Sequence, residues 1–113
     1  MTTRRELITT SSYSLLLCLM ENQSMYGYQI IKELEARSAG YFKFKEGTLY
    51  PALHRLEKSG LFSGKWQKLP NGRQRRYYHI TAKGLAKLAE DRTQWQDYLN
   101  AVKLILQPGQ SHP

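Results

Sequence analysis

The residues best suited to do chemistry in this 113-residue chain are cations, and they are clustered. Seventeen lysine and arginine residues stand against nine aspartate and glutamate residues, which gives a net charge of +8. Residues 41–76 hold nine of the cations and only two acidic residues, and so carry seven of the eight net charges. A concentrated basic segment of this kind indicates binding to a polyanion such as a nucleic acid. A solvated charged loop is the simpler alternative.

Other kinds of site find little support in the residues. Neither His54 nor His79 has a matched nucleophile, so we do not expect an enzyme. One cysteine and three histidines do not make up a zinc site, and no cofactor is expected. Cys18 has no disulfide partner, and the longest apolar run, residues 15–20, is too short to span a bilayer. We therefore expect a cytoplasmic protein that does not contact membranes.

The spacing of apolar residues predicts four helices and one hairpin in a single compact domain. The helices are expected over residues 10–21, 25–37, 46–58 and 82–107. Ser24 is a suitable N-cap for the second helix, and Pro51 should lie in the first turn of the third, where its ring meets no helical carbonyl. Strands are expected over residues 61–67 and 74–80, because Asn71-Gly72 between them is a strong tight-turn signal.

The last helix carries an apolar seam with heptad spacing. Its members lie alternately three and four residues apart: Leu85, Leu88, Arg92, Trp95, Leu99, Val102 and Leu106. Such a seam is typical of a helix that packs along another helix, and a helix of roughly 39 Å is too long for so short a domain to cover. We therefore expect a homodimer, with Leu16 and Leu19 of the apolar first helix also at the interface. The alternative is that the helix folds back on its own core.

The order α-α-α-β-β-α predicts a winged helix-turn-helix, a mainly α fold with a small β component, whose third helix enters the major groove of DNA. Residues 1–81 would form the DNA-binding domain, residues 82–107 a dimerisation helix and residues 108–113 a flexible tail. The residues expected to face double-stranded DNA are exposed on the third helix or lie in the wing: Lys45, Thr48, Tyr50, Pro51, His54, Arg55, Lys65, Arg73, Arg75 and Arg76. Among them Arg55 is a candidate for contact with a base edge.

Several motifs resemble those of the PadR-like transcriptional regulators. They are YGYQI at residues 26–30, EGTLYPAL at residues 46–53 and GRQRRYY at residues 72–78, followed by Ile80-Thr81 and Gly84. The resemblance runs from about Leu15 to Gly84 in a single register. It implies a homodimeric repressor with a winged-helix DNA-binding domain, bound to an inverted-repeat operator that overlaps a promoter. A winged-helix module that binds another protein and no ligand is the alternative.

With one helix after the wing, the chain is similar to the short subgroup of this family, which includes multidrug-sensing regulators. In some of those sensors a tryptophan on the last helix lines a flat apolar pore at the dimer interface, where planar aromatic ligands stack. The resemblance thus implies that Trp95, with its copy in the partner chain, binds a planar aromatic effector that releases the repressor from DNA. The alternative is that Trp95 is part of the dimer core.

Overall fold

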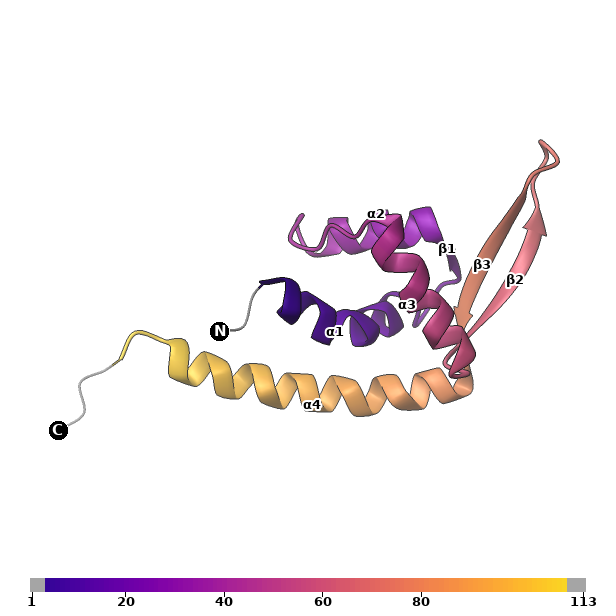
Figure 1. Cartoon of the computed structure of the whole chain (residues 1–113). Coiled ribbons are helices and arrows are strands. Elements are labelled where there is room, and N and C mark those ends of the chain that lie inside the picture. Colours follow the sequence, from indigo (N-terminus) through magenta and orange to yellow (C-terminus); the bar gives the residue numbers. More distant parts are fainter. Residues whose placement is uncertain (1–3, 110–113) are drawn as a thin grey trace.

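The computed structural model describes residues 4–109, with side chains from Ser11 onward. Its elements are α1 (Arg4–Leu19), β1 (Met25–Tyr26), α2 (Gly27–Arg37), α3 (Glu46–Lys58), β2 (Phe62–Lys68), β3 (Gln74–Ile80) and α4 (Ala82–Leu106). Helices α1 to α3 form a small bundle, the β2–β3 hairpin projects from it, and α4 runs alongside α1 (Figure 1). The molecule measures 70 × 27 × 24 Å, because the hairpin and the last turns of α4 extend from opposite ends.

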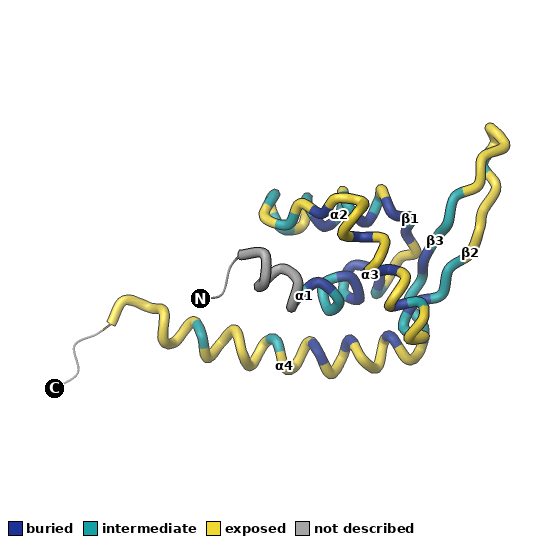
Figure 2. Tube along the Cα trace, viewed as in Figure 1, coloured by how far each residue is buried: buried dark blue, intermediate teal, exposed yellow. Residues whose placement is uncertain are grey.

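The hydrophobic core lies where the helices meet. Apolar residues three or four positions apart turn one face of each helix inward. The fully buried side chains are Leu16, Leu17, Met20, Ile30, Leu49, Leu53, Phe62 and Leu88. Figure 2 shows that burial falls off toward the tip of the hairpin and toward the C-terminal half of α4. These two parts of the chain therefore present most of their side chains to solvent.

The three strands form one antiparallel sheet in the order β1-β3-β2. The hairpin register runs from Phe62 opposite Ile80 to Lys68 opposite Gln74. At its end, the amide of Gly72 donates to the carbonyl oxygen of Leu69 at 2.9 Å, and Gly72 has φ +85°. The predicted hairpin is confirmed, but the turn is centred on Pro70-Asn71, and Gly72 follows it in the left-handed region that glycine tolerates.

The joint between the hairpin and α4 is tightly packed. Thr81 caps α4, because its side-chain oxygen accepts from the amide of Gly84 at 3.0 Å. The amide of Thr81 donates to the carbonyl oxygen of Leu61 at 3.0 Å. A Cβ atom on Gly84 would overlap with that same oxygen, so only glycine lets α4 start this close to the segment that ends α3.

The structure corrects several predicted boundaries. Helix α1 begins at Arg4, since nothing in residues 4–9 breaks a helix, and it ends at Leu19. The prediction of Ser24 as an N-cap is wrong, because residues 25–26 pair with β3 and α2 starts only at Gly27. Gln29 Oε1 accepts from the amide of Tyr26 at 3.2 Å instead. Helix α3 starts at Glu46, so Pro51 lies in its second turn and not in its first.

The arrangement confirms the predicted winged helix-turn-helix, with β1 as an additional short strand. Helices α2 and α3 are the helix-turn-helix pair, and the β2–β3 hairpin is the wing. Of the predicted tail, residues 108–109 have no regular structure and residues 110–113 lie outside the described residues.

Candidate nucleic-acid interface and ligand pocket

Helix α3 turns one polar face to solvent. Its apolar stripe of Leu49, Ala52, Leu53 and Leu56 is buried against the bundle. The residues predicted to face DNA are all exposed: Lys45 directly before the helix, and Thr48, Tyr50, Pro51, His54 and Arg55 on it. An exposed polar face on this helix is what entry into a major groove requires.

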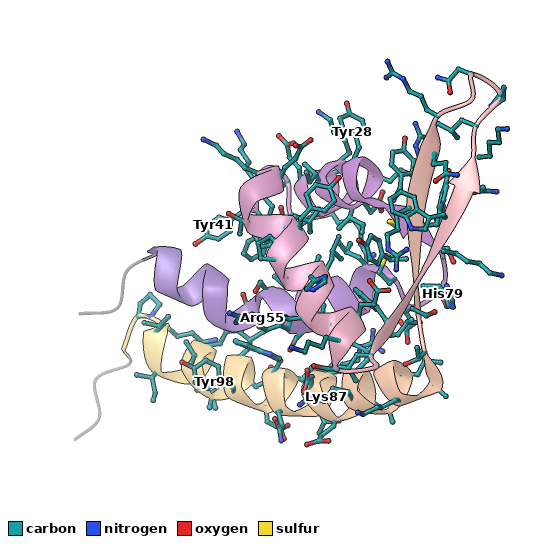
Figure 3. The ribbon with its side chains drawn as sticks, turned by 45° about the vertical axis from the view of Figure 1, so that its right-hand side comes forward. Tyr28, Tyr41, Arg55, His79, Lys87 and Tyr98 are labelled. Carbon is teal, nitrogen blue, oxygen red and sulfur yellow. The ribbon has the colours of Figure 1, made fainter. Side chains whose placement is uncertain are left out.

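Arg55 and His54 lie on different flanks of α3. The Nη1 atom of Arg55 donates to the hydroxyl of Tyr13 on α1 at 3.2 Å, and Arg55 is labelled on that side in Figure 3. His54 instead lines a hollow between α3 and the wing together with Trp66. Arg55 is thus oriented toward α1. His54, and not Arg55, is the side chain of this pair that faces the space between α3 and the wing.

Tyrosines extend the exposed face of α3 onto α2. A Cβ atom on Gly27 would lie 2.5 Å from the hydroxyl oxygen of Tyr50, so the missing side chain at Gly27 lets Tyr50 cover the start of α2. Tyr28 is 58% exposed, and the ammonium of Lys32 lies 5.5 Å from the centroid of its ring. The predicted interface omitted Tyr28, because the sequence pattern does not distinguish a tyrosine that covers the core from one that faces solvent.

The wing holds its cations in two settings. Lys65, Lys68 and Arg73 are exposed along β2 and at the turn, whereas Arg75 and Arg76 are partly covered. The predicted interface did not include Lys68, although the turn signal places it at the end of β2. Exposed cations of this kind can meet phosphate groups.

Arg75 lies on the outer face of the sheet. Its guanidinium carbon is 3.8 Å from the centroid of the Tyr26 ring, a cation–π contact. The Tyr26 ring packs edge-on against Tyr77 with centroids 5.4 Å apart. Arg75 thus contacts β1, the strand that leads directly into α2.

Arg76 lies on the inner face, toward α3. It forms an ion pair with Glu57, and its guanidinium lies near the rings of Trp66 and Tyr78. Burial raises the pKa of Tyr78. Arg76 was predicted to line the DNA surface. That prediction did not include its ion pair with Glu57, which is distant in sequence but adjacent in space.

A cavity of about 420 Å³ opens between α1 and α4. Its lining is mostly apolar and includes Leu15, Cys18, Phe42, Leu88, Trp95 and Leu99. Trp95 is half-buried and packs edge-on against Tyr98, with ring centroids 5.8 Å apart. The volume lies within the range of pockets for small organic molecules.

A chain of hydrogen bonds forms the polar edge of this cavity. The indole nitrogen of Trp95 donates to Ser14 Oγ at 3.1 Å, and Ser14 Oγ donates to the Oδ2 atom of Asp91 at 2.9 Å. Lys87 contacts the other carboxylate oxygen at 2.7 Å, which raises the pKa of Lys87. The sequence pattern did not single out Asp91, because a charged residue outside the heptad seam gives no sign of burial. The buried positions of α4 are Gly84, Leu88 and Asp91, and only Leu88 belongs to the predicted seam.

Arg92 also contacts α1 of its own chain. Its guanidinium donates to both carboxylate oxygens of Glu21, at 2.9 and 3.2 Å, and to Cys18 Sγ at 3.8 Å. These hydrogen bonds hold the pKa of Glu21 below its usual 4.5 and raise the pKa of Arg92. Arg92 was predicted at the dimer interface, but in this structure it ties the end of α1 to α4.

The other residues of the predicted interface fall into two groups. Leu16 and Leu88 are 0% and 1% exposed inside one chain, which leaves no surface for a second subunit, so the prediction is corrected for both. Leu19 is 6% exposed and also belongs to the chain's own core. Leu99 and Leu106 are exposed, and Val102 is half-buried.

Among the side chains of residues 11–109 there is no cluster of three or more able to hold a metal ion. None of the helices within residues 4–109 has the length and apolarity needed to cross a membrane.

Comparison with known proteins agrees with this geometry. The model of the transcriptional regulator PadR-like family matches residues 16–90. The chain is 36% identical over 91 residues to the transcriptional regulator Rv3488 of Mycobacterium tuberculosis, covering 80% of this chain and 78% of that protein. A PadR-like transcriptional regulator from Bacillus cereus superposes with a TM-score of 0.80 at 30% identity, covering 92% of this chain and 99% of that one. A transcriptional regulator from Clostridium thermocellum gives 0.81 at 25% identity, with coverage of 90% and 99%. By sequence and by fold, the chain belongs to the PadR-like family of transcriptional regulators, which are DNA-binding proteins and not enzymes.

Proposed function

We propose that this regulator is a homodimeric repressor that binds an inverted-repeat operator overlapping a promoter. The observation that carries the proposal is the exposure of cations on both sides of the polar face of α3: Lys45 at its N-terminus, and Lys65, Lys68 and Arg73 on the wing. Phosphate contacts from these cations supply affinity and fix the register on the duplex. Thr48 and His54 on α3 then read base edges.

The salt dependence of binding tests this assignment. Genomic DNA fragments retained by the immobilised protein supply the duplex, and its affinity is measured over a series of salt concentrations. Each phosphate contact contributes about 0.9 to the slope of log affinity against log salt, so Arg73→Ala should lower the slope by about that amount. Arg37→Ala, which removes the same charge at the far end of α2, is the control and should leave the slope unchanged. Equal slopes for wild type and Arg73→Ala would contradict the wing contact and favour the protein-interaction module.

The second half of α4 supplies the surface for dimerisation. Leu99, Leu104, Ile105 and Leu106 are 49% to 83% exposed, an apolar surface unusual for a helix that faces only water. Two-fold pairing through this half covers these side chains and presents two α3 helices to one operator. Two half-sites about 34–36 Å apart would then be bound at once.

The cavity beside Trp95 is proposed as the effector site. Its apolar lining and the half-buried indole suit a planar aromatic molecule, and Trp95 of the partner subunit would contribute the second face in a dimer. An effector releases the repressor if it binds more tightly to a dimer geometry that fits the operator poorly. The alternative remains that Trp95 only fills the dimer core.

Tryptophan fluorescence separates the two roles of Trp95. In a Trp66→Phe protein the remaining emission comes from Trp95 alone, because the chain has two tryptophans. Titration with a panel of planar aromatic dyes should quench this emission, and the same dyes should weaken operator binding. Unchanged emission across the panel would contradict the effector site and leave the DNA-binding proposal standing.

A further inference from the structure

Arg76 contacts α3 through one ion pair and contacts two aromatic rings within the wing. It forms an ion pair with Glu57 on α3, and the two side chains are 27% and 28% exposed. Its guanidinium carbon lies 5.3 Å from the centroid of Trp66 and 5.8 Å from that of Tyr78. Because Trp66 is the cross-strand partner of Arg76, the strand register itself sets the stacking.

Gly64 makes room for this side chain. A Cβ atom on Gly64 would lie 2.5 to 2.6 Å from the Nη2, Cζ and Nε atoms of Arg76. The guanidinium therefore lies flat on the backbone of β2, at a distance that no other residue type permits. The guanidinium of Arg76 thus has four neighbours: the backbone at Gly64, the rings of Trp66 and Tyr78, and the carboxylate of Glu57.

We infer that Arg76 is a positioning residue, which sets the angle between the wing and the recognition helix and does not itself bind phosphate. The inference rests on the proposed binding of DNA by α3 and the wing. The charge of Arg76 is already compensated by Glu57, and its guanidinium is partly removed from water, whereas Arg73 at the turn is exposed. Through Glu57, Arg76 acts on the placement of Lys65, Lys68 and Arg73.

The direction in which Glu57→Gln changes the affinity for DNA distinguishes a positioning role of Arg76 from phosphate binding. Glu57→Gln removes a negative charge beside the DNA and frees Arg76, so it should strengthen binding if Arg76 contacts phosphate. If Arg76 positions the wing, Glu57→Gln should weaken operator affinity by about tenfold, because the Arg–carboxylate ion pair becomes a weaker bond to an uncharged amide. Glu90→Gln, which removes an equal charge on the exposed side of α4, is the control.

Gly64→Ala tests the same contact without changing any charge. The added methyl group displaces the guanidinium, and we expect operator affinity to fall as it does in Glu57→Gln. Ser63→Ala, on the opposite face of β2, is the matched control and should bind normally. The exchange Glu57→Arg with Arg76→Glu should restore part of the affinity that Arg76→Glu alone loses, because the ion pair is re-formed. No restoration by the exchange, together with tighter binding of Glu57→Gln, would overturn the inference.

A readout without DNA keeps this test separate from that of the proposed function. In a Trp95→Phe protein the emission anisotropy of Trp66 reports the motion of the wing, and it should fall in Glu57→Gln and Gly64→Ala but not in Ser63→Ala. Unchanged anisotropy in both variants would overturn the positioning role even if wild type binds DNA. Wild-type protein that binds no DNA would overturn the proposed function, whatever the anisotropy shows.

Discussion

The two halves of α4 carry one apolar pattern but have different neighbours. In the first half Leu88 is 1% exposed, Asp91 accepts a hydrogen bond from Ser14 of α1, and Arg92 donates to Glu21 just after α1. In the second half Leu104 and Ile105 are 74% and 83% exposed. Figure 2 shows this change along the helix.

A heptad seam therefore predicts that a helix is covered, but it does not identify which element or subunit covers it. For the first half, the alternative that the helix folds back on its own core is the correct one, because α1 occupies the seam. In the second half, no other described element covers the exposed apolar side chains, and a second subunit is the proposed partner. Substitutions in the two halves should therefore change different measured quantities.

The largest effect on folding is expected at Leu88. Leu88→Ala leaves a cavity in the core and should lower the free energy of unfolding by about 2–5 kcal/mol. Chemical denaturation at several protein concentrations measures this loss, which should persist at each of them. Leu85→Ala, at a side chain that is 44% exposed, is the control and should stay within about 0.5 kcal/mol of wild type. Equal losses in both variants would contradict the burial described for this half.

In the second half, the expected effect is on assembly. Leu99→Asp places an unpaired charge in the proposed dimer surface and should weaken dimerisation about 100-fold or more, since such a charge costs several kcal/mol to bury. Sedimentation velocity measures the dissociation, and circular dichroism should show unchanged helix content. Asn100→Asp adds the same charge beside the seam and should remain dimeric. A dimeric Leu99→Asp protein would show that a different surface pairs the subunits.

A smaller effect is expected at Asp91. Asp91→Asn weakens the charge-assisted bonds from Lys87 and Ser14, and we expect a loss of about 1–2 kcal/mol in the free energy of unfolding. Because Ser14 also accepts from Trp95, the emission of Trp95 should change at the same time. Asp97→Asn, at an exposed position of the second half, is the comparison and should alter neither quantity.

The smallest effect concerns Glu21 and depends on pH. Its pKa is lower in the folded chain than the usual 4.5, because Arg92 donates hydrogen bonds to the carboxylate. The ion pair therefore stabilises the fold above pH 4.5, and this contribution is lost as the pH falls through the folded-state pKa. Wild type should lose slightly more stability than Glu21→Gln on acidification, as measured by thermal unfolding between pH 6 and pH 3. Parallel curves would show that the pair contributes nothing measurable to folding.

The local elements could be predicted from the sequence, because each depends on spacing along the chain. The apolar spacing predicts the helix at residues 46–58, and Asn71-Gly72 predicts the turn before the strand at residues 74–80. The strand at Met25–Tyr26 could not be found in this way, since two residues carry no period and their pairing with β3 is long-range.

The candidate site was predicted only in part, for the same reason. The exposure of Thr48 and His54 follows from the helical period of α3, which the sequence contains. The environment of Arg76 depends on Glu57, nineteen residues earlier, and a charged residue in a sequence does not say whether its partner is a phosphate or a carboxylate. Charge counts thus predict a basic wing but not which of its cations are exposed.

The close contact of Gly84 with the carbonyl of Leu61, together with the hydrogen bonds of Asp91 and Arg92, joins α4 rigidly to the winged-helix domain. At 1.5 Å per residue the helix is about 37 Å long, so a rotation of the whole domain by roughly 5° about the far end of α4 moves the joint at Gly84 by about 3 Å. The start of α4 cannot slide past the segment that follows α3, because Gly84 would clash with the carbonyl of Leu61. In a dimer joined at the C-terminal ends of its two α4 helices, the angle at which these helices cross therefore sets the distance between the two wings.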